Sequence, residues 1–130
     1  MADNIIVAGI GGQGSILASH IIADAAILYN VKNKLGGNVR VGETFGAAQR
    51  GGAVASHVKI GDIYGPLVRK GHADMVLALE PLEGLRIGLD YLAPDGIAIL
   101  NATPESPVDV KVGAVACPSL DSITAAVASI

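Results

Sequence analysis

A cluster of glycines follows the first apolar segment of the 130-residue chain, in the sequence GIGGQG over residues 9–14. Its spacing matches G-x-G-x-x-G, and it lies between a predicted strand (4–9) and a predicted helix (15–29), where this pattern is typical of nucleotide binding. Glycines let the backbone approach a phosphate closely, and the first N–H groups of the helix point toward it. The candidate binding residues are Gly9, Gly11, Gly12, Gln13 and Gly14.

The companion residue of a dinucleotide site is missing. Such a site also needs an acidic side chain about 20 positions further on, at the end of the second strand, to bind the ribose hydroxyls. Residues 30–41 offer only asparagine, lysine and arginine as polar side chains. The sequence therefore argues against NAD. It leaves open a tight turn that packs against another backbone, and it leaves open the binding of another anion or of a partner segment.

A lone arginine stands before two glycines in the sequence AQRGG, residues 48–52. Gly51 and Gly52 permit backbone angles that a side chain forbids, and they let another surface come close. Arg50 can present two parallel N–H donors to a carboxylate or a phosphate. An internal ion pair would not need the glycines, so the pattern favours an interface or ligand contact that also includes Gln49.

Two carboxylates flank a predicted helix start in LEPLEG. Glu80 ends a predicted buried strand (75–80), and Glu83 lies in the first turn of a predicted helix (81–92). Ligands of open α/β sheets bind at the carboxyl ends of strands, which would suit acid–base chemistry. Ordinary helix-start chemistry explains the pattern better, with Glu80 as the N-cap and Pro81 at the first helical position.

The histidines and the single cysteine suggest no further site. His20 and Asp24 lie one helical turn apart and are expected to form a surface pair. His57 is predicted on the polar face of a strand, and His72 in a loop. One cysteine, Cys117, excludes an internal disulfide, and it excludes an iron–sulfur cluster or a cysteine-rich zinc site held by this chain alone.

Composition narrows the class of protein. A length of 130 residues fits one domain. Hydrophobic residues make up 51% and charged residues 16% of the chain, which fits a compact fold or a protein whose surface is partly covered by partners. A net charge of −3 with few aromatics indicates no nucleic-acid surface. The N-terminus does not read as a signal peptide, and the apolar residues 16–29 are too few to span a bilayer. The expected compartment is the cytoplasm.

Strands and helices alternate along the chain, which predicts a three-layer α/β/α Rossmann-like domain with a mainly parallel sheet. Residues 53–60 alternate between polar and apolar, so we expect an inserted antiparallel or edge strand there. The sequence PDG (94–96) predicts a turn, and a final helix is expected from Ser119. The remaining strands are predicted at 4–9, 38–41, 75–80, 97–101 and 110–117.

Four motifs in this order resemble the gamma domain of the 2-oxoacid:ferredoxin oxidoreductases, most closely the beta subunit of indolepyruvate ferredoxin oxidoreductase. They are the glycine turn (9–14), GAAQRGGAVASHV (46–58), GHAD (71–74) and LEPLEGLR (79–86). Phe45 stands where the indolepyruvate members usually carry histidine. The family domain normally extends further than this sequence, so the single domain 1–130 is either a short member or one truncated at its C-terminus.

The resemblance implies a subunit of an enzyme of anaerobic metabolism. The family decarboxylates a 2-oxoacid such as indolepyruvate or pyruvate on thiamine diphosphate with magnesium. It passes electrons through iron–sulfur clusters to ferredoxin and releases an acyl-CoA. This chain would be inactive alone, would bind none of these cofactors alone, and would complete the complex and its active site beside catalytic alpha- and beta-type subunits. The resemblance makes Arg50 a contact to such a partner, near the shared active site.

Two other functions stay open. One is a stand-alone dinucleotide-binding module, against which the missing acidic residue argues. The other is a non-catalytic assembly domain, which composition alone does not separate from an enzyme subunit.

Overall fold

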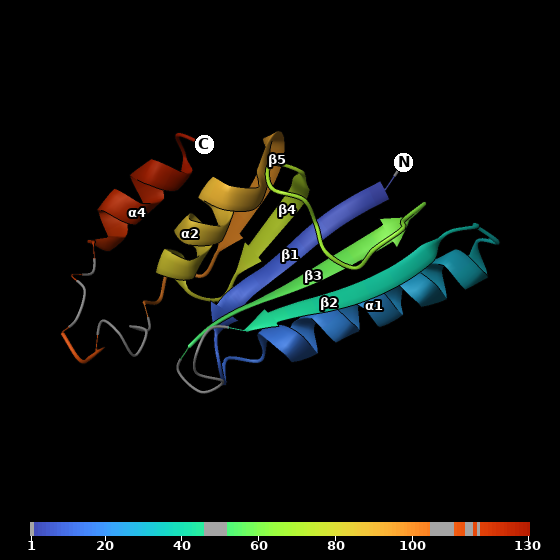
Figure 1. Cartoon of the computed structure of the whole chain (residues 1–130), viewed down its shortest axis with the longest axis horizontal. Helices are drawn as coiled ribbons and strands as arrows, with labels where there is room; N and C mark the ends of the chain where they lie inside the picture. Colours follow the sequence, from blue (N-terminus) through green and yellow to red (C-terminus); the bar gives the residue numbers. More distant parts are fainter. Residues whose placement is uncertain (1, 46–51, 105–110, 114–115, 117) are drawn as a thin grey trace.

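The computed structural model describes most of the chain as one five-stranded sheet with helices on its two faces (Figure 1). The described residues are 2–45, 52–104, 111–113, 116 and 118–130. In chain order the elements are β1 (Ala2–Ile10), α1 (Ser15–Lys32), β2 (Asn38–Phe45), β3 (Ala53–Gly61), β4 (Ala73–Ala78), α2 (Pro81–Tyr91), β5 (Leu92–Leu100) and α4 (Leu120–Val127).

The strands lie in the order β2-β3-β1-β4-β5. β3 is antiparallel to both of its neighbours, whereas β1, β4 and β5 are parallel to one another. Four strands therefore run in one direction and β3 runs against them. This confirms the mainly parallel sheet with one inserted antiparallel strand, which lies inside the sheet rather than at its edge.

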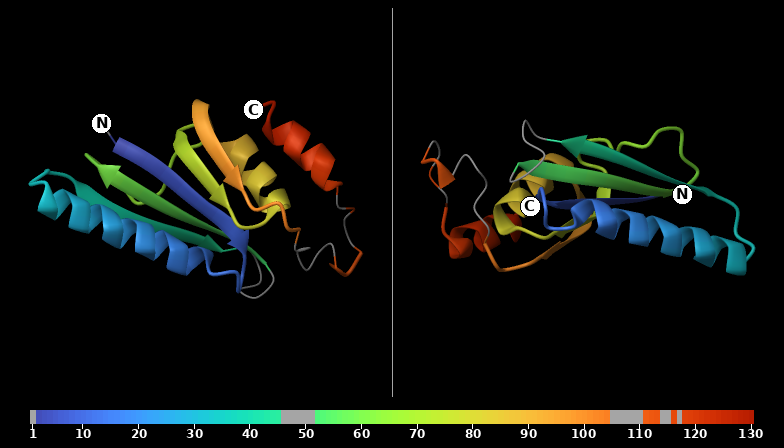
Figure 2. Two further views of the ribbon diagram at one scale, coloured as in Figure 1. Left: turned by 180° about the vertical axis from the view of Figure 1, so that it is seen from behind. Right: turned by 90° about the horizontal axis from the view of Figure 1, so that it is seen from below.

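The helices divide between the two faces of the sheet (Figure 2). α1 packs over β1, β3 and β2 on one face, and α2 packs over β4, β5 and β1 on the other, with α4 beside α2. Because both faces of β1 are covered, its residues Ile6, Val7 and Ala8 are fully buried. Ile6 and Ala8 belong to the core under α2, together with Val76 and Ile87. The three-layer α/β/α prediction is confirmed.

His57 lies in this core, and its predicted place on a polar strand face is wrong. Only 1% of the residue is exposed, and its ring meets the ring of Tyr91 edge-on at 5.4 Å between centroids. Its Nδ1 accepts a hydrogen bond from the N–H of Val68 over 3.2 Å. The alternation suggested a strand with one exposed polar face, but β3 has strands on both sides and α1 on one face, while Val68 and Tyr91 cover His57 on the other.

Three predicted boundaries also differ from the structure. β2 is eight residues long rather than four. β5 begins at Leu92, so the residues predicted as a turn at 94–96 lie within the strand, where its register with β4 shifts. Of the strand predicted at 110–117, the described residues 111–113 lie in helix and turn conformation, and Gly113 has a φ of 74°. That strand prediction is wrong over those residues, and most of its remainder lies outside the described part.

Candidate functional site

The connections of the sheet change direction at the carboxyl ends of β1 and β4. These strands are neighbours and parallel, but α1 leads away from β1 toward β2 on one face, while α2 leads away from β4 toward β5 on the other (Figure 1). This reversal is the topological switch point at which open α/β sheets bind their ligands. The glycine turn and the start of α2 therefore meet at the predicted place.

The glycine turn has the backbone that its sequence requires. Gly12 and Gly14 have φ values of 101° and 88°, a region that residues with a side chain rarely adopt. Gly14 is the N-cap of α1 and provides no side-chain cap. The N–H of Gly11 donates to the carbonyl of Gly52 over 2.8 Å, and the N–H of Gln13 donates to Ile10 over 3.0 Å. Two N–H groups of the turn are thus used within the chain.

The bond between Gly11 and Gly52 brings two of the sequence motifs together. Gly52 ends the AQRGG motif and immediately precedes β3, and the register pairs Ile10 with Ala53. The motif is therefore anchored at the carboxyl end of β1, beside the glycine turn. Gln49, Arg50 and Gly51 lie outside the described residues.

Gln13 links the glycine turn to the end of β4. Its Oε1 accepts a hydrogen bond from the N–H of Ile10 over 2.8 Å, and its Nε2 donates to the carbonyl of Leu79 over 3.4 Å. A methyl group added at Gly9 would lie 2.9 Å from the Gln13 Oε1, so Gly9 leaves the space that this side chain occupies. These contacts favour a close-packed turn over a loop that is open for phosphate.

Asn101, which sequence reasoning treated only as the end of a strand, completes this link. Its Nδ2 donates to the same Leu79 carbonyl over 3.3 Å, and its own N–H donates to Ala78 over 2.8 Å. The ends of β1, β4 and β5 are thereby tied through one carbonyl oxygen. The available signal was an asparagine directly after an apolar strand, at the same sheet edge as the glycine turn.

The two glutamates form the predicted helix start. Glu80 is the N-cap of α2, and its Oε2 accepts from the N–H of Glu83 over 2.8 Å. Glu83 in turn accepts two hydrogen bonds from Arg86, over 3.1 and 2.6 Å. Burial raises the pKa of the Glu83 carboxyl, the adjacent Arg86 guanidinium opposes that shift, and the charge of Glu80 adds to it. Both carboxylates therefore stabilise the start of α2, as the helix-start interpretation predicts.

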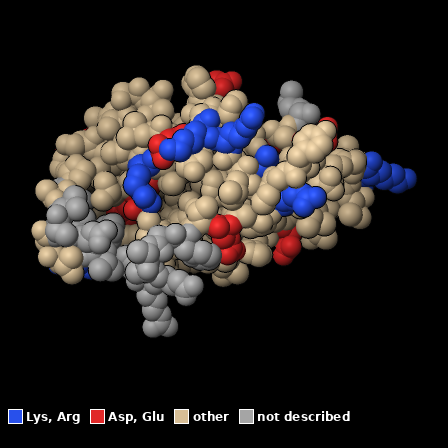
Figure 3. Space-filling view, in the orientation of Figure 1, with Lys and Arg blue, Asp and Glu red and all other residues tan. Residues whose placement is uncertain are grey.

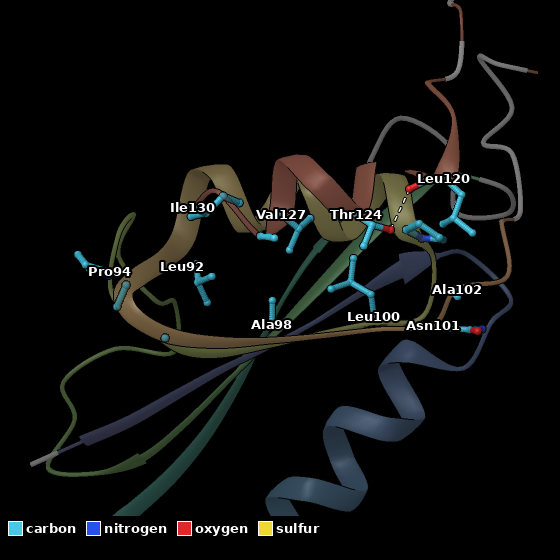
Figure 4. Close-up of a pocket in the computed structure, with 14 residues that line it drawn as sticks. Leu92, Pro94, Ala98, Leu100, Asn101, Ala102, Leu120, Thr124, Val127 and Ile130 are labelled. Atoms are coloured by element: carbon cyan, nitrogen blue, oxygen red, sulfur yellow. Dashed lines mark hydrogen bonds between the residues drawn. The ribbon is translucent and has the colours of Figure 1, made fainter. Parts of the chain in front are cut away.

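An apolar cavity of about 520 Å³ lies beside this edge of the sheet, between β5 and α4 (Figure 4). Side chains of Leu92, Ala98 and Leu100 point into it from β5, and Val127 and Ile130 face them (Figure 4). Its polar side chains are engaged: Thr124 donates to the carbonyl of Leu120, and Asn101 donates to Leu79. The cavity therefore offers apolar contact and no group with acid–base chemistry.

The charged side chains add no second site. On the face shown in Figure 3, basic and acidic side chains are interspersed, and Lys70 pairs with Asp90 over 3.2 Å. Among the described residues, no three histidines, cysteines or acids gather as a metal ion would require. His20 pairs with Glu43 of β2 over 3.1 Å, so its predicted pairing with Asp24 is wrong. No described helix has both the length and the apolar character needed to cross a membrane.

Together, the switch point, the glycine turn and the tied strand ends define a Rossmann-like α/β domain in which Gly52 is anchored at the ligand edge. Residues 4–128 match the sequence model of the family described as pyruvate ferredoxin/flavodoxin oxidoreductase, and the chain belongs to this family. The resemblance noted from the four motifs is confirmed.

Curated relatives agree with this assignment. The chain is 45% identical over 123 residues to the indolepyruvate oxidoreductase subunit IorB of Archaeoglobus fulgidus. This match covers 95% of this chain and 58% of the relative. It is 42% identical over 121 residues to the protein of the same name from Pyrococcus horikoshii, covering 92% of this chain and 56% of the relative. The chain thus spans a little more than half the length of these relatives.

Solved structures share the fold. The gamma subunit of a keto/oxoacid ferredoxin oxidoreductase from Geobacter sulfurreducens has a TM-score of 0.57 and 29% identity, covering 81% of this chain and 56% of that one. The pyruvate oxidoreductase subunit PORC of Thermotoga maritima has a TM-score of 0.60 and 24% identity, covering 80% of this chain and 52% of that one. The second likeness concerns the fold alone.

Proposed function

We propose that this chain is the gamma-type component of a 2-oxoacid:ferredoxin oxidoreductase and acts by completing the complex of its catalytic subunits. The observation that carries the proposal is the match of over nine-tenths of the chain to relatives named as indolepyruvate oxidoreductase subunits. The structure is consistent with it, because the carboxylates of Glu80 and Glu83 cap and brace the start of α2.

The cofactors of the reaction belong, in this proposal, to the partner subunits. Thiamine diphosphate supplies the decarboxylation chemistry, and an iron–sulfur cluster needs several cysteine thiolates, whereas this sequence contains one cysteine. The donor set of this chain therefore does not fit a cluster. The expected substrates are 2-oxoacids such as indolepyruvate or pyruvate, with CoA and ferredoxin reached through the complex in the cytoplasm.

The contribution of this chain is to hold the AQRGG motif at the ligand edge. Gly52 is fixed to Gly11 at the carboxyl end of β1, while Gln13 and Asn101 tie that end to β4 and β5. Arg50 is the residue of this motif that we assign to the partner contact.

A stand-alone dinucleotide module is not favoured by the geometry. In the glycine turn, the N–H groups of Gly11 and Gln13 already have carbonyl partners, and the Gln13 side chain fills the space over Gly9. These two N–H groups are therefore already engaged within the chain and are not directed at a pyrophosphate.

Reconstitution tests the proposal. The chain should be co-expressed with the catalytic subunit of a relative such as the Archaeoglobus fulgidus enzyme, and CoA-dependent ferredoxin reduction should be measured with indolepyruvate, phenylpyruvate and pyruvate. We expect turnover only when both chains are present. Stable assembly without any gain in turnover would instead assign an assembly role. Tight NAD or FAD binding by the isolated chain would revive the dinucleotide module.

A further inference from the structure

The connection between β3 and β4 covers a part of the sheet that the described helices leave open. α2 packs over β4, β5 and β1, whereas β2 and β3 carry residues 62–68 of the connection on that side. In Figure 2 (right) this segment lies on the opposite side of the sheet from α1. Ile63 is 6% exposed and Val68 is 4% exposed, and Val68 belongs to the core under α2. We call residues 62–68 the strap.

Contacts with β2 and β3 hold the strap on the sheet. A methyl group added at Gly42 of β2 would lie 2.9 Å from the side chain of Leu67 and 3.0 Å from that of Pro66, so Gly42 leaves space for the strap. The N–H of Val68 donates to Nδ1 of His57 in β3 over 3.2 Å. Within the described part of the chain, this is the only hydrogen bond that a residue of the strap makes. The strap is thus attached by apolar packing and by one polar contact.

His57 can accept this hydrogen bond only while its Nδ1 carries no hydrogen. In that form Nε2 carries the ring hydrogen, and this nitrogen is buried without a hydrogen-bond partner. A second proton would break the bond and leave the N–H of Val68 buried beside a buried cation. Unpaired polar groups and charges are costly in a protein interior, whereas displacement of the strap would let water reach both groups.

We propose that the strap is an acid-sensitive cover of the sheet, which opens locally when His57 gains a proton while the rest of the domain stays folded. The strap has no regular secondary structure, and few hydrogen bonds are typical of segments that open at low free energy. By contrast, β1 is paired along both of its edges, and its central residues are fully buried. The strap should therefore open more readily than the sheet beneath it.

The charges around His57 do not favour a protonated ring in the closed form. Its ring meets that of Tyr91 in α2, and the residues opposite it on β1 and β2 are apolar. Two positions along β3, on the same face, Lys59 is paired with Arg40 of β2, so the charges on these strands are positive. Burial accordingly lowers the pKa of the His57 imidazole. The other charged or titratable side chains of the connection and of the end of α2 are exposed: Asp62, Arg69, Lys70, His72 and Asp90.

The direction of the pH dependence follows from this lowered pKa. Above the ordinary histidine pKa, near 6.5, the ring is neutral in both forms and the strap stays closed. As the pH falls below that value, the open form binds a proton that the closed form resists. With one proton linked to opening, the ratio of open to closed strap should rise severalfold, up to about tenfold, between pH 7.5 and pH 5.5.

Amide hydrogen exchange followed by NMR tests the strap in the 130-residue chain. The N–H of Val68 reports opening of the strap, and the N–H of Ile6 in β1 reports opening of the sheet, once each rate is corrected for the intrinsic pH dependence of exchange. We expect Val68 to exchange faster than Ile6 and with little dependence on dilute urea, since local opening exposes little surface. Its opening ratio should then rise severalfold from pH 7.5 to pH 5.5. Exchange of Val68 that matches Ile6 in rate and urea dependence would exclude local opening.

Two histidine variants separate His57 from general effects of acid. His57→Gln keeps an acceptor but does not titrate, so the opening ratio of the strap should change by less than about twofold over the same pH range. His72→Gln is the matched control, because it removes an exposed histidine from the same connection and should retain the full response.

The chain without substitutions provides a further readout that does not depend on the folding of a variant. Nitrogen-15 NMR of the His57 imidazole should show the hydrogen on Nε2 at pH 7.5. A hydrogen on Nδ1 at that pH, pH-independent opening at Val68, or an undiminished response in His57→Gln would each overturn the proposal. The strap does not depend on the proposed enzyme function, so failure of one leaves the other standing.

Discussion

At the scale of single residues, His57 is the most unusual side chain of the described structure. Its Nδ1 accepts the N–H of Val68, which places the ring hydrogen on Nε2, and that buried nitrogen has no hydrogen-bond partner. Protonation would place a hydrogen on Nδ1, where it would face the N–H of Val68 and the hydrogen bond would be lost. Burial accordingly lowers the pKa of the His57 imidazole below its usual value of 6.5.

This lowered pKa predicts a loss of stability in mild acid. Above the unfolded pKa, near 6.5, both states hold a neutral ring and the stability is complete. As the pH falls through that value, the unfolded chain binds a proton that the folded chain resists. The free energy of unfolding should therefore decrease, by at most about 1.4 kcal/mol per pH unit for one proton. Urea unfolding between pH 8 and pH 5.5 measures this slope.

His57→Gln is the control for that slope. The glutamine keeps an acceptor for the N–H of Val68 but does not titrate, so the variant should be less stable at pH 8 and show a flatter pH dependence. His20 and His72 remain in both proteins and contribute equally to both curves. Identical slopes in the two proteins would show that His57 does not limit acid stability.

At the scale of elements, the glycine turn shows how backbone conformation alone constrains the sequence. A methyl group added at Gly14 would meet no atom within 4 Å, and the same is true at Gly36 in the turn before β2. The two sites differ in backbone angle, since Gly14 has a φ of 88° and Gly36 has no positive φ. Because neither site is crowded, comparing them isolates the effect of backbone strain.

We predict that Gly14→Ala lowers the free energy of unfolding by about 1–2 kcal/mol, because a residue with a Cβ pays this cost in a left-handed conformation. Gly36→Ala should be neutral or slightly stabilising, since it mainly reduces the freedom of the unfolded chain. Paired urea titrations in one buffer measure both. Equal effects would mean that the turn relaxes around its N-cap.

Local signals were enough to predict some elements and not others. The glycine turn, the Glu80 cap and the strand through 75–78 each follow from adjacent residues, and the structure has all three. β5 runs through the PDG sequence because Leu92 pairs with Ala73 before it and Ile97 pairs with Met75 after it, with a shift of register between the two pairs that no local pattern records. The burial of His57 likewise depends on the neighbours of β3 and on α2.

The sequence likewise predicted only part of the candidate site. The motifs indicated which segments carry it, but not that Gly11 binds Gly52 or that Gln13 and Asn101 share the Leu79 carbonyl. Those contacts join residues 22 to 66 positions apart, and their partners are backbone groups that every residue has. Only the strand order brings them together.

At the scale of the whole molecule, the described surfaces suit a component of an assembly. The acids at the ligand edge are used within the chain, while large apolar side chains of α1 and β5 face outward. The AQRGG motif is anchored at the braced edge through Gly52. This distribution agrees with the proposed function, in which the chain contributes position and contact and its partners carry the chemistry.

Arg50 provides the sharpest test of that role. If it makes a charge-assisted contact across the subunit interface, Arg50→Ala should leave the melting temperature of the isolated chain unchanged, because an exposed arginine adds little stability. The same change should weaken binding to the catalytic subunit by roughly 2–5 kcal/mol, the cost of leaving a buried partner charge unpaired.

Comparison with Arg50→Lys separates the planar guanidinium from its charge. An ammonium does not reproduce two parallel hydrogen bonds, so the lysine variant should recover only part of the affinity and turnover. An internal ion pair predicts the reverse order, with a lower melting temperature for the isolated alanine variant and an intact complex. Calorimetric melting of each chain alone, followed by titration with the catalytic subunit, distinguishes the two cases. Full affinity and turnover in Arg50→Ala would remove Arg50 from the interface.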